Sequence, residues 1–262
     1  MAMELAVTIG KNSYRIDPAE GMDISIPVRF DENGLTAFGA EKASSTAYQA
    51  EGFIGAVEKG GSCNCGLYHF SPHLHGTHTE CVGHLSKNAL HITDRLPQAF
   101  VTATLITVTP ETEEGDRVIT KQSLESALKE AAYDFMDALV IRTLPNDAEK
   151  KSRDYDGKEM PPYFTGEAMA FIVLAGVRHL LVDLPSIDRM DDGGALANHR
   201  MFWNVPEGAG GISEGMASDD TVTELIYVPE AIKDGKYLLN LQVAAFAADA
   251  APSRPVLYEV MT

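Results

Sequence analysis

An apolar strand, a helix and a second apolar strand follow one another between residues 138 and 184, and this order constrains the fold most strongly. Ala138-Leu139-Val140-Ile141 is a continuous apolar run, typical of a strand buried on both faces. Thr165 is expected to cap the following helix, because its side-chain oxygen can accept a hydrogen bond from a free backbone N–H of the first turn. Val177 to Leu184 supplies the second strand. This order predicts parallel pairing with a right-handed crossover.

Other segments add strands and one more helix. Asp23 to Val28 alternates as a strand does, with Pro27 suggesting a sheet edge, and Asp31 to Gly34 is a turn, most simply a hairpin connection. We also expect a half-buried strand over 101–108, a solvated loop over 145–162 and a strand over 235–242. A helix is expected over 121–135, and its apolar positions are Leu124, Leu128, Ala131, Ala132 and Phe135. The helix after Thr165 should bury a stripe of Met169, Ile172, Val173 and Gly176. Together they predict a mixed α/β or α+β fold.

Composition narrows the class of protein and its partners. A chain of 262 residues with 45% hydrophobic residues can bury a large core as one domain or two small ones. The net charge of −17 argues against nucleic acid and anionic membrane surfaces as partners. There is no basic leader followed by an apolar core and no run of about eighteen apolar residues, and three cysteines cannot form a disulfide framework. The cytoplasm is therefore the expected compartment.

Histidines are concentrated between Ser71 and His84, where four of the chain's eight lie within fourteen residues. Histidine is the commonest metal ligand, so this density suggests a metal site. In an extended segment His78 and Glu80 share a face, with Cα atoms roughly 6.7 Å apart, and His84 falls on the same face. His73 and His75 fall on the other face. A bulge at Gly76 would flip that parity, so we expect a bulged strand that directs the histidines and Glu80 into one cavity.

Another candidate ligand, His199, lies in a helical pattern further along the chain. On a helix, His199 shares a face with Leu196, Phe202 and Trp203, so its imidazole points inward. An inward imidazole can bind a metal, although a single inward histidine is more often a satisfied core residue. Cys63 and Cys65 could add thiolate ligands, or could be part of a strand of small residues, because no second cysteine pair completes a zinc motif. Arg142 could orient a substrate carboxylate or hold a neighbouring loop.

The stretch Gly76-Thr77-His78-Thr79-Glu80-Cys81-Val82-Gly83-His84 resembles the His-x-Gly-Thr-His-x-Asp-x-Pro-x-His signature of the Putative cyclase family, which includes the bacterial kynurenine formamidases. The resemblance implies that His78 and Glu80 are metal ligands and that His84 is the acid/base residue. Glu80 stands where the family has Asp, and Val82 where it has Pro. Leu74 occupies the slot of the first ligand, so that ligand must be His73 or His75, and we favour His73.

Later segments extend the resemblance over most of the chain. The family's second metal segment reads Asp-x-Pro-Ser-Ile-Asp and is followed by a helix that carries Asn-His. Residues 183–188 and the helix with Asn198-His199 resemble it, which implies that His199 is a ligand. The stretch 222–226 resembles the segment whose Glu completes the site, here Glu224, and 206–220 resembles an insertion. Three other segments also resemble the family. They are the first strand at 23–27, the strand end at Arg142-Thr143 and the closing strand at 251–258. The family implies a single domain over 1–262 with a mixed, β-barrel-like sheet flanked by helices, a swivelling β/β/α fold, in homodimers or higher homo-oligomers.

These residues define an expected chemistry. His73, His78, Glu80, His199 and Glu224 give three imidazoles and two carboxylates, which suit zinc first and manganese or iron as alternatives, with one ion or two bridged by Glu80. Such a cation lowers the pKa of bound water and polarises a carbonyl, and His84 would carry the proton to the leaving group. We therefore expect a metal-dependent hydrolase acting on a small amide, ester or lactone, with N-formylkynurenine as the family's best-known substrate. The alternatives are a metal-dependent cyclase or lyase, and a non-catalytic protein that stores or senses metal.

Overall fold

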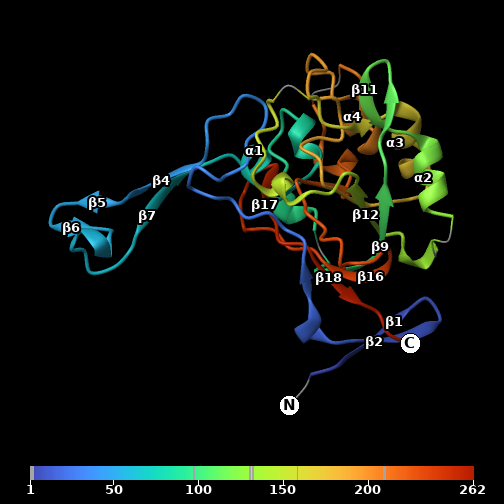
Figure 1. Cartoon of the computed structure of the whole chain (residues 1–262), viewed down its shortest axis with the longest axis horizontal. Helices are drawn as coiled ribbons and strands as arrows, with labels where there is room; N and C mark the ends of the chain where they lie inside the picture. Colours follow the sequence, from blue (N-terminus) through green and yellow to red (C-terminus); the bar gives the residue numbers. More distant parts are fainter. Residues whose placement is uncertain (1–2, 97, 130, 132, 158, 209–210) are drawn as a thin grey trace.

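A nine-stranded mixed sheet forms the centre of the computed structural model, which describes residues 3–96, 98–129, 131, 133–157, 159–208 and 211–262. In spatial order its strands are β17 (Ala250–Pro252), β8 (His78–Glu80), β15 (Thr221–Glu224), β14 (His179–Val182), β12 (Ala138–Thr143), β9 (Phe100–Val108), β16 (Gly235–Asn240), β18 (Val256–Glu259) and β3 (Met22–Asp23). The sheet curls into a half-barrel with the few helices beside it (Figure 1). The expected mixed α/β fold with a barrel-like core is confirmed.

The four central strands β15, β14, β12 and β9 run parallel, and each strand outside them pairs antiparallel with its neighbours. Within this core β12 pairs with β14 in parallel, as the strand, helix and strand order predicts. Strands from distant parts of the chain therefore lie side by side. β8 in particular lies between β15 and β17, which come more than 140 residues later.

Both faces of the central strands are covered by apolar side chains. Along β12, Leu139 and Ile141 pack on the face carrying the helices, whereas Ala138 and Val140 pack on the opposite face. The helices are α2 (Lys121–Ala127), α3 (Gly166–Leu174) and α4 (Ala197–Phe202), and their buried residues join the first of these cores. The second core is closed by residues of β9, β16 and β18. Double coverage explains why β12 is a continuous apolar run.

Smaller elements surround the sheet. They are the hairpin β1 (Leu5–Ile9) and β2 (Asn12–Ile16), the small sheet β10 (Glu111–Glu113), β11 (Asp116–Ile119) and β13 (Tyr163–Phe164), and 3₁₀ helices at Pro18–Glu20, Val57–Lys59, Val82–Leu85, Ile92–Asp94, Tyr133–Phe135, Ala148–Ser152 and Glu214–Met216. The C-terminus lies beside the first hairpin, where Arg15 and Met261 form a bridge (Figure 1). Among the described residues, no helix has the length and apolar character needed to cross a bilayer.

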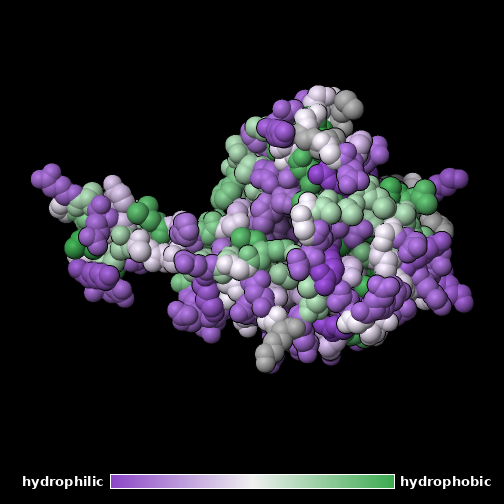
Figure 2. All heavy atoms as spheres, turned by 90° about the horizontal axis from the view of Figure 1, so that it is seen from above, coloured by the Kyte–Doolittle hydropathy of each residue, from purple (hydrophilic) through white to green (hydrophobic). Residues whose placement is uncertain are grey.

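A long arm, residues 44–69, projects from the body. It consists of β4 (Ser44–Ala47) paired with β7 (Gly66–His69), and of β5 (Gln49–Ala50) paired with β6 (Phe53–Ile54) at its tip. The arm stands apart from the body in two views at right angles, and hydrophobic and hydrophilic side chains are mixed on its surface (Figures 1 and 2). Its end joins the short helix α1 (Pro72–His75), which leads into β8.

Several local expectations need correction. The helix from Lys121 ends at Ala127 and Tyr133–Phe135 is a separate turn, while Ala132 lies outside the described residues. The strand over 100–108 is largely buried, not half-buried, because helices cover one face and β-strand side chains close the other. Of the strand predicted over 23–28, only Asp23 lies in a strand of the sheet, as part of β3, and residues 31–34 form a turn that joins no paired strands.

The helix after Thr165 has the predicted cap, since the Thr165 hydroxyl accepts a hydrogen bond from the backbone N–H of Ala168. Its buried residues are Ala168, Met169 and Ile172, and Val173 is exposed because it falls on the solvent side of this short helix. The loop over 145–162 is not wholly solvated either. Lys150 within it is buried against Asp183 at the end of β14.

Arg142 holds a neighbouring loop, as one of its two interpretations predicts. Its guanidinium donates hydrogen bonds to the backbone oxygens of Pro229 and Ile232 and pairs with Asp234. All of these partners belong to the segment before β16, and Nε donates to the hydroxyl of Thr107 on β9, so the side chain ties that segment to the sheet. Cys63 and Cys65 are exposed on the arm, and neither belongs to a group of potential metal ligands among the described residues.

Candidate metal centre

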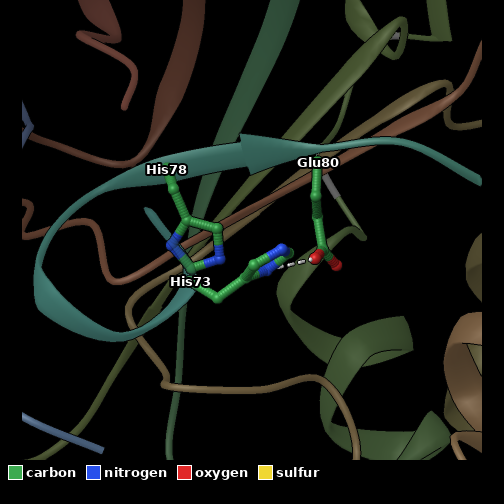
Figure 3. Close-up of side chains that lie close together, drawn as sticks. All are labelled: His73, His78 and Glu80. Carbon is green, nitrogen blue, oxygen red and sulfur yellow. Dashed lines mark ion pairs between the residues drawn. The ribbon is translucent and has the colours of Figure 1, made fainter. Parts of the chain in front are cut away.

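The predicted ligands meet at one edge of the sheet. His78 and Glu80 lie on β8, and the antiparallel pairing of β8 with β15 places Glu224 opposite His78. α1 brings His73 over this pair, and α4 brings His199 from the other side. Figure 3 shows His78 and Glu80 projecting from the same strand, with the ring of His73 between them and paired with Glu80. All five residues converge, and their role as metal ligands stays a prediction.

Glu80 is the centre of the cluster. Its Oε2 lies 3.0 Å from Nδ1 of His73, and its Oε1 lies 2.8 Å from Nε2 of His199. Glu224 approaches the same space, with Oε2 3.5 Å from Nε2 of His78 and Oε1 3.5 Å from Nε2 of His199. The nitrogen and oxygen atoms of the five predicted ligands therefore form two groups, His73-His78-Glu80 and Glu80-His199-Glu224, each spanning no more than 4.8 Å and sharing Glu80, and a third group of this size is His73-His84-Asp249. A carboxylate shared in this way can bridge two ions.

The donor atoms fit a divalent cation. Nδ1 of His78 donates to the carbonyl oxygen of Gly76 at 3.1 Å, so its other nitrogen, Nε2, presents a lone pair to the cluster. That nitrogen is buried and has no hydrogen-bond partner among the described residues. Nδ1 of His199 lies 2.6 Å from Oδ2 of Asp188, which likewise directs its Nε2 toward the two glutamates. Metal-binding histidines usually donate the N–H of the other ring nitrogen to a carboxylate or a backbone carbonyl, as His78 and His199 do here.

The cluster requires positive charge. Burial raises the pKa of Glu80, but the charges of His84 and His199 outweigh it and hold that pKa well below its usual range. Burial and the charge of Glu80 act to raise the pKa of Glu224, yet the neighbouring His199 and His78 lower it. Conversely, burial lowers the pKa of His73, but hydrogen bonds with Asp249 and Glu80 raise it to about 10. Protons on the histidines or a bound cation can each balance the buried carboxylates.

His73 joins the cluster and His75 does not. His75 is buried beside Glu41, whose carbonyl oxygen lies 2.8 Å from its Nε2, and its Nδ1 contacts Ser71. The expected bulged strand is wrong here. Residues 72–75 form one helical turn, with Pro72 at its first position, and this turn rotates His73 and His75 to different directions. Gly76 is extended, and a Cβ on it would lie 2.9 Å from the carbonyl oxygen of Ile26.

His84 lies at the rim of the cluster in the 3₁₀ helix Val82–Leu85, not on the strand face predicted from its parity. Its side chain is partly exposed, and its Nδ1 lies 3.7 Å from Oε2 of Glu80. The short helix explains the difference, because the chain leaves the sheet directly after Glu80. His84 can therefore meet both the buried carboxylate and solvent.

Two carboxylates at the site were not predicted. Asp188, which contacts His199, closes the 183–188 segment that resembles the family, so the sequence held a signal for it. Asp249 has its Oδ2 3.0 Å from Nε2 of His73 and 3.3 Å from Nδ1 of His84. It lies in an alanine-rich segment without a local motif, and only the pairing of β17 with β8 brings it to the histidines. Hydrogen bonds from His73 and His84 lower the pKa of Asp249.

A small cavity of about 190 Å³ opens onto these groups. His73, Glu80, His84, His199 and Glu224 form its polar wall. The remaining wall is mostly apolar and consists of Phe38, Leu74, Pro185, Ser186 and Leu196. A concave apolar space with a few converging polar groups is typical of small-molecule sites.

Comparisons with known proteins agree with the fold. The kynurenine formamidases of Bacillus thuringiensis subsp. konkukian and Bacillus cereus (strain ATCC 14579) are each 27% identical to the chain over 205 residues, which cover 76% of this chain and 82% of the relative. Among solved structures, a potential metal-dependent hydrolase with cyclase activity has a TM-score of 0.59 at 14% identity, covering 92% of this chain and 98% of the other. Isatin hydrolase A from Labrenzia aggregata has a TM-score of 0.62 at 13% identity, covering 91% and 93%.

A family model named Putative cyclase matches residues 22–189, which hold the histidine stretch and three of the four parallel strands of the core, β9, β12 and β14. The match covers more than half of the chain. The expectation of an enzyme is confirmed, and the chain belongs to the Putative cyclase family.

Proposed function

We propose that this protein is a metal-dependent hydrolase that cleaves the C–N bond of a small amide of the formamide type. The observation that carries the proposal is the pair of ligand groups sharing buried Glu80 on the wall of a small cavity. The names of the relatives, formamidase and hydrolase, support the same reaction class. The cavity of about 190 Å³ favours a small substrate over a polymer.

The cation would be held by His73, His78, Glu80, His199 and Glu224. Three imidazoles with two carboxylates favour zinc, with manganese or iron as the alternatives. A bound divalent cation supplies Lewis-acid polarisation of the carbonyl and lowers the pKa of water. Protein groups fix the ligands in turn, since Asp188 holds His199 and the backbone of Gly76 holds His78. The buried, unpartnered nitrogen of His78 is the strongest support for a cation in this place.

The protein's own groups account for the proton movements and the shielding. Water adds to the amide carbon and the C–N bond breaks, so one proton must leave the water and one must reach the departing nitrogen. His84 is suited to both transfers, because its ring borders the cavity, is partly exposed and lies 3.7 Å from Glu80. Phe38, Leu74 and Leu196 also line the cavity, and their apolar side chains would limit the access of bulk water to the reacting groups.

Metal content and turnover of His84→Ala test this function. The protein purified without added metal or chelator should carry one to two equivalents of zinc, manganese or iron per chain, and should hydrolyse aryl formamides. His84→Ala should keep the metal and lose most of the turnover, by 100-fold or more as expected for a lost acid/base group. His91→Ala is the matched control, because among the described residues this partly exposed histidine pairs with Asp94, outside the cluster. This variant should leave metal content and turnover unchanged.

The outcome separates the rival functions. Wild-type protein that neither holds nor takes up metal on titration contradicts the proposal. Formation of a cyclised product, identified by mass spectrometry, assigns a cyclase or lyase in place of the hydrolase. Metal binding without turnover on formamides, esters or lactones assigns a binding protein.

We also infer that two or more copies of the chain associate through the arm. Leu67, Tyr68 and Val57 are more than half exposed on it, and a two-stranded hairpin is only marginally stable alone in water. The arm leads directly into α1, so its partner would also affect His73. We treat residues 1–262 as one domain, because strands from both ends of the chain pair in one sheet. The three free cysteines suit the cytoplasm as the compartment.

A further inference from the structure

Asp249 touches two histidines of the site through a single oxygen atom. Its Oδ2 lies 3.0 Å from Nε2 of His73 and 3.3 Å from Nδ1 of His84. The two rings lie one over the other, with centroids 4.6 Å apart and an interplanar angle of 37°. One carboxylate oxygen has two lone pairs and can accept a hydrogen bond from each ring. The contacts therefore form one connected unit.

The main chain fixes Asp249 firmly. The backbone N–H of Cys81 donates to its carbonyl oxygen at 3.0 Å, and the N–H of Ile92 donates to the carbonyl oxygen of Ala248 at 2.8 Å. Gly83 allows this close approach, because a Cβ there would lie 3.0 Å from the Asp249 Cβ. A carboxylate anchored in this way can orient its partners accurately.

Contact with Asp249 determines which nitrogen of His73 carries the proton. When Nε2 donates to Asp249, a neutral His73 must present the lone pair of Nδ1, which lies 3.0 Å from Oε2 of Glu80. That is the nitrogen in the group His73-His78-Glu80 that faces the buried cluster. Hydrogen bonding of one imidazole nitrogen by a carboxylate sets the tautomer of a metal-binding histidine.

The same carboxylate acts in the opposite sense on His84. Here Nδ1 is the atom that faces Asp249, at 3.3 Å, so a neutral His84 would present the lone pair of Nε2. A carboxylate that holds one imidazole nitrogen in this manner leaves the other free to take a proton, which is the logic of the carboxylate in a Ser-His-Asp triad. Asp249 thus selects complementary tautomers in the two rings.

We propose that Asp249 is a positioning residue that sets the orientation and tautomer of both His73 and His84. The inference rests on the proposed function of the site. Asp249 would then act on both histidines. Removal of its carboxylate should weaken metal binding through His73 and slow turnover through His84. Asp249 does not itself bind the metal in this arrangement.

Three variants test the role. Asp249→Ala removes both contacts, and Asp249→Asn keeps one acceptor oxygen, so its effects should be smaller. Asp23→Asn is the matched control, because its side chain is 36% exposed against 37% for Asp249 and it pairs with Arg254 outside the cluster. Thermal unfolding of the metal-free proteins checks that all three fold.

The main readout is zinc affinity, measured by competition with a chromophoric chelator, together with metal content and kinetics. Asp249→Ala should retain the wild-type number of zinc ions per chain but bind zinc 10- to 100-fold more weakly, as found when the hydrogen-bond partner of a metal-binding histidine is removed. With saturating zinc, kcat should fall at least tenfold and KM should change little. Asp23→Asn should match the wild type in every measurement.

Two results overturn the inference. Unchanged zinc affinity and kcat in Asp249→Ala would show that the contacts have no influence on either histidine. Loss of one whole zinc equivalent would make Asp249 a ligand and not a positioning residue. If wild-type protein itself lacks metal and turnover, the proposed function fails; if only the Asp249 variants behave as wild type, the function stands and this inference alone fails.

Discussion

Removal of the ammonium group in Lys150→Met should destabilise the protein strongly. Lys150 and Asp183 are both buried, and the Lys150 ammonium lies 2.7 Å from Oδ2 of Asp183. The ammonium also donates to the carbonyl and hydroxyl oxygens of Thr143, at 2.7 and 3.0 Å. In Lys150→Met the carboxylate of Asp183 stays buried without its counter-charge.

The loss of stability in Lys150→Met depends on the hydrogen bonds that Asp183 retains. Loss of one partner of a buried ion pair costs about 3–5 kcal/mol. Asp183 retains hydrogen bonds from the backbone N–H and the hydroxyl of Thr143, at 2.9 and 2.8 Å, so we expect the lower end of this range. For a chain of this size, a loss of about 3 kcal/mol corresponds to a decrease in Tm of roughly 6–12 °C.

The loss of stability in Lys150→Met should increase with pH. Burial raises the pKa of Asp183 above its ordinary value of 3.8, although Lys150 opposes the shift. A folded state with a raised carboxyl pKa binds the proton more tightly than the unfolded state, so the free energy of unfolding falls as pH rises through that window. Without Lys150 the pKa rises further, and the deficit of Lys150→Met should be larger at pH 7 than at pH 5.

Urea denaturation of the wild type, Lys150→Met and Lys151→Met at both pH values measures these effects. Lys151 is the neighbouring control, since it is exposed and lies over the ring of Tyr227 at 5.0 Å, so its replacement should cost at most about 1 kcal/mol. A deficit below 1 kcal/mol for Lys150→Met, or one that grows as the pH falls, would refute the reasoning.

Three further outcomes are expected. Because the pKa of His73 is raised to about 10, the metal-free protein should lose free energy of unfolding as pH rises from about 6.5 to 10, and a flat series of thermal unfolding curves contradicts this. The double variant Leu67→Glu/Tyr68→Glu should be more monomeric than the wild type in light scattering, because both side chains are exposed on the arm. A wild-type protein that is itself monomeric contradicts the proposed association through the arm. Thr165→Ala should cost about 1 kcal/mol in urea denaturation through loss of the cap, and no change refutes it.

Local patterns predicted the central fold because they depend on neighbouring residues. The apolar run of 138–141 requires cover on both faces, and the Thr165 cap needs only the first turn of its helix. The family signature added what spacing alone left open, namely that His199 and Glu224 approach the histidine stretch. The geometry places both with Glu80.

Features that depend on distant contacts were missed. The parity argument assumed an extended segment at 73–75, but a single helical turn was enough to separate His73 from His75. Asp249 carries no local signal, because its meaning arises only from the register Ala250↔Glu80 between β17 and β8. Burial of Lys150 in a charged loop also follows from Asp183 at the end of another strand.

The position of β8 between β15 and β17 also sets an order of events during synthesis. The histidine stretch leaves the ribosome early, but Glu224 follows about 140 residues later and Asp249 only near the end of the chain. A nascent chain therefore carries a row of exposed imidazoles long before the carboxylates that complete the cluster have been made. A metal held by the proposed ligands would then be bound by a nearly finished polypeptide, and products of premature termination before residue 224 would lack one of these ligands, Glu224.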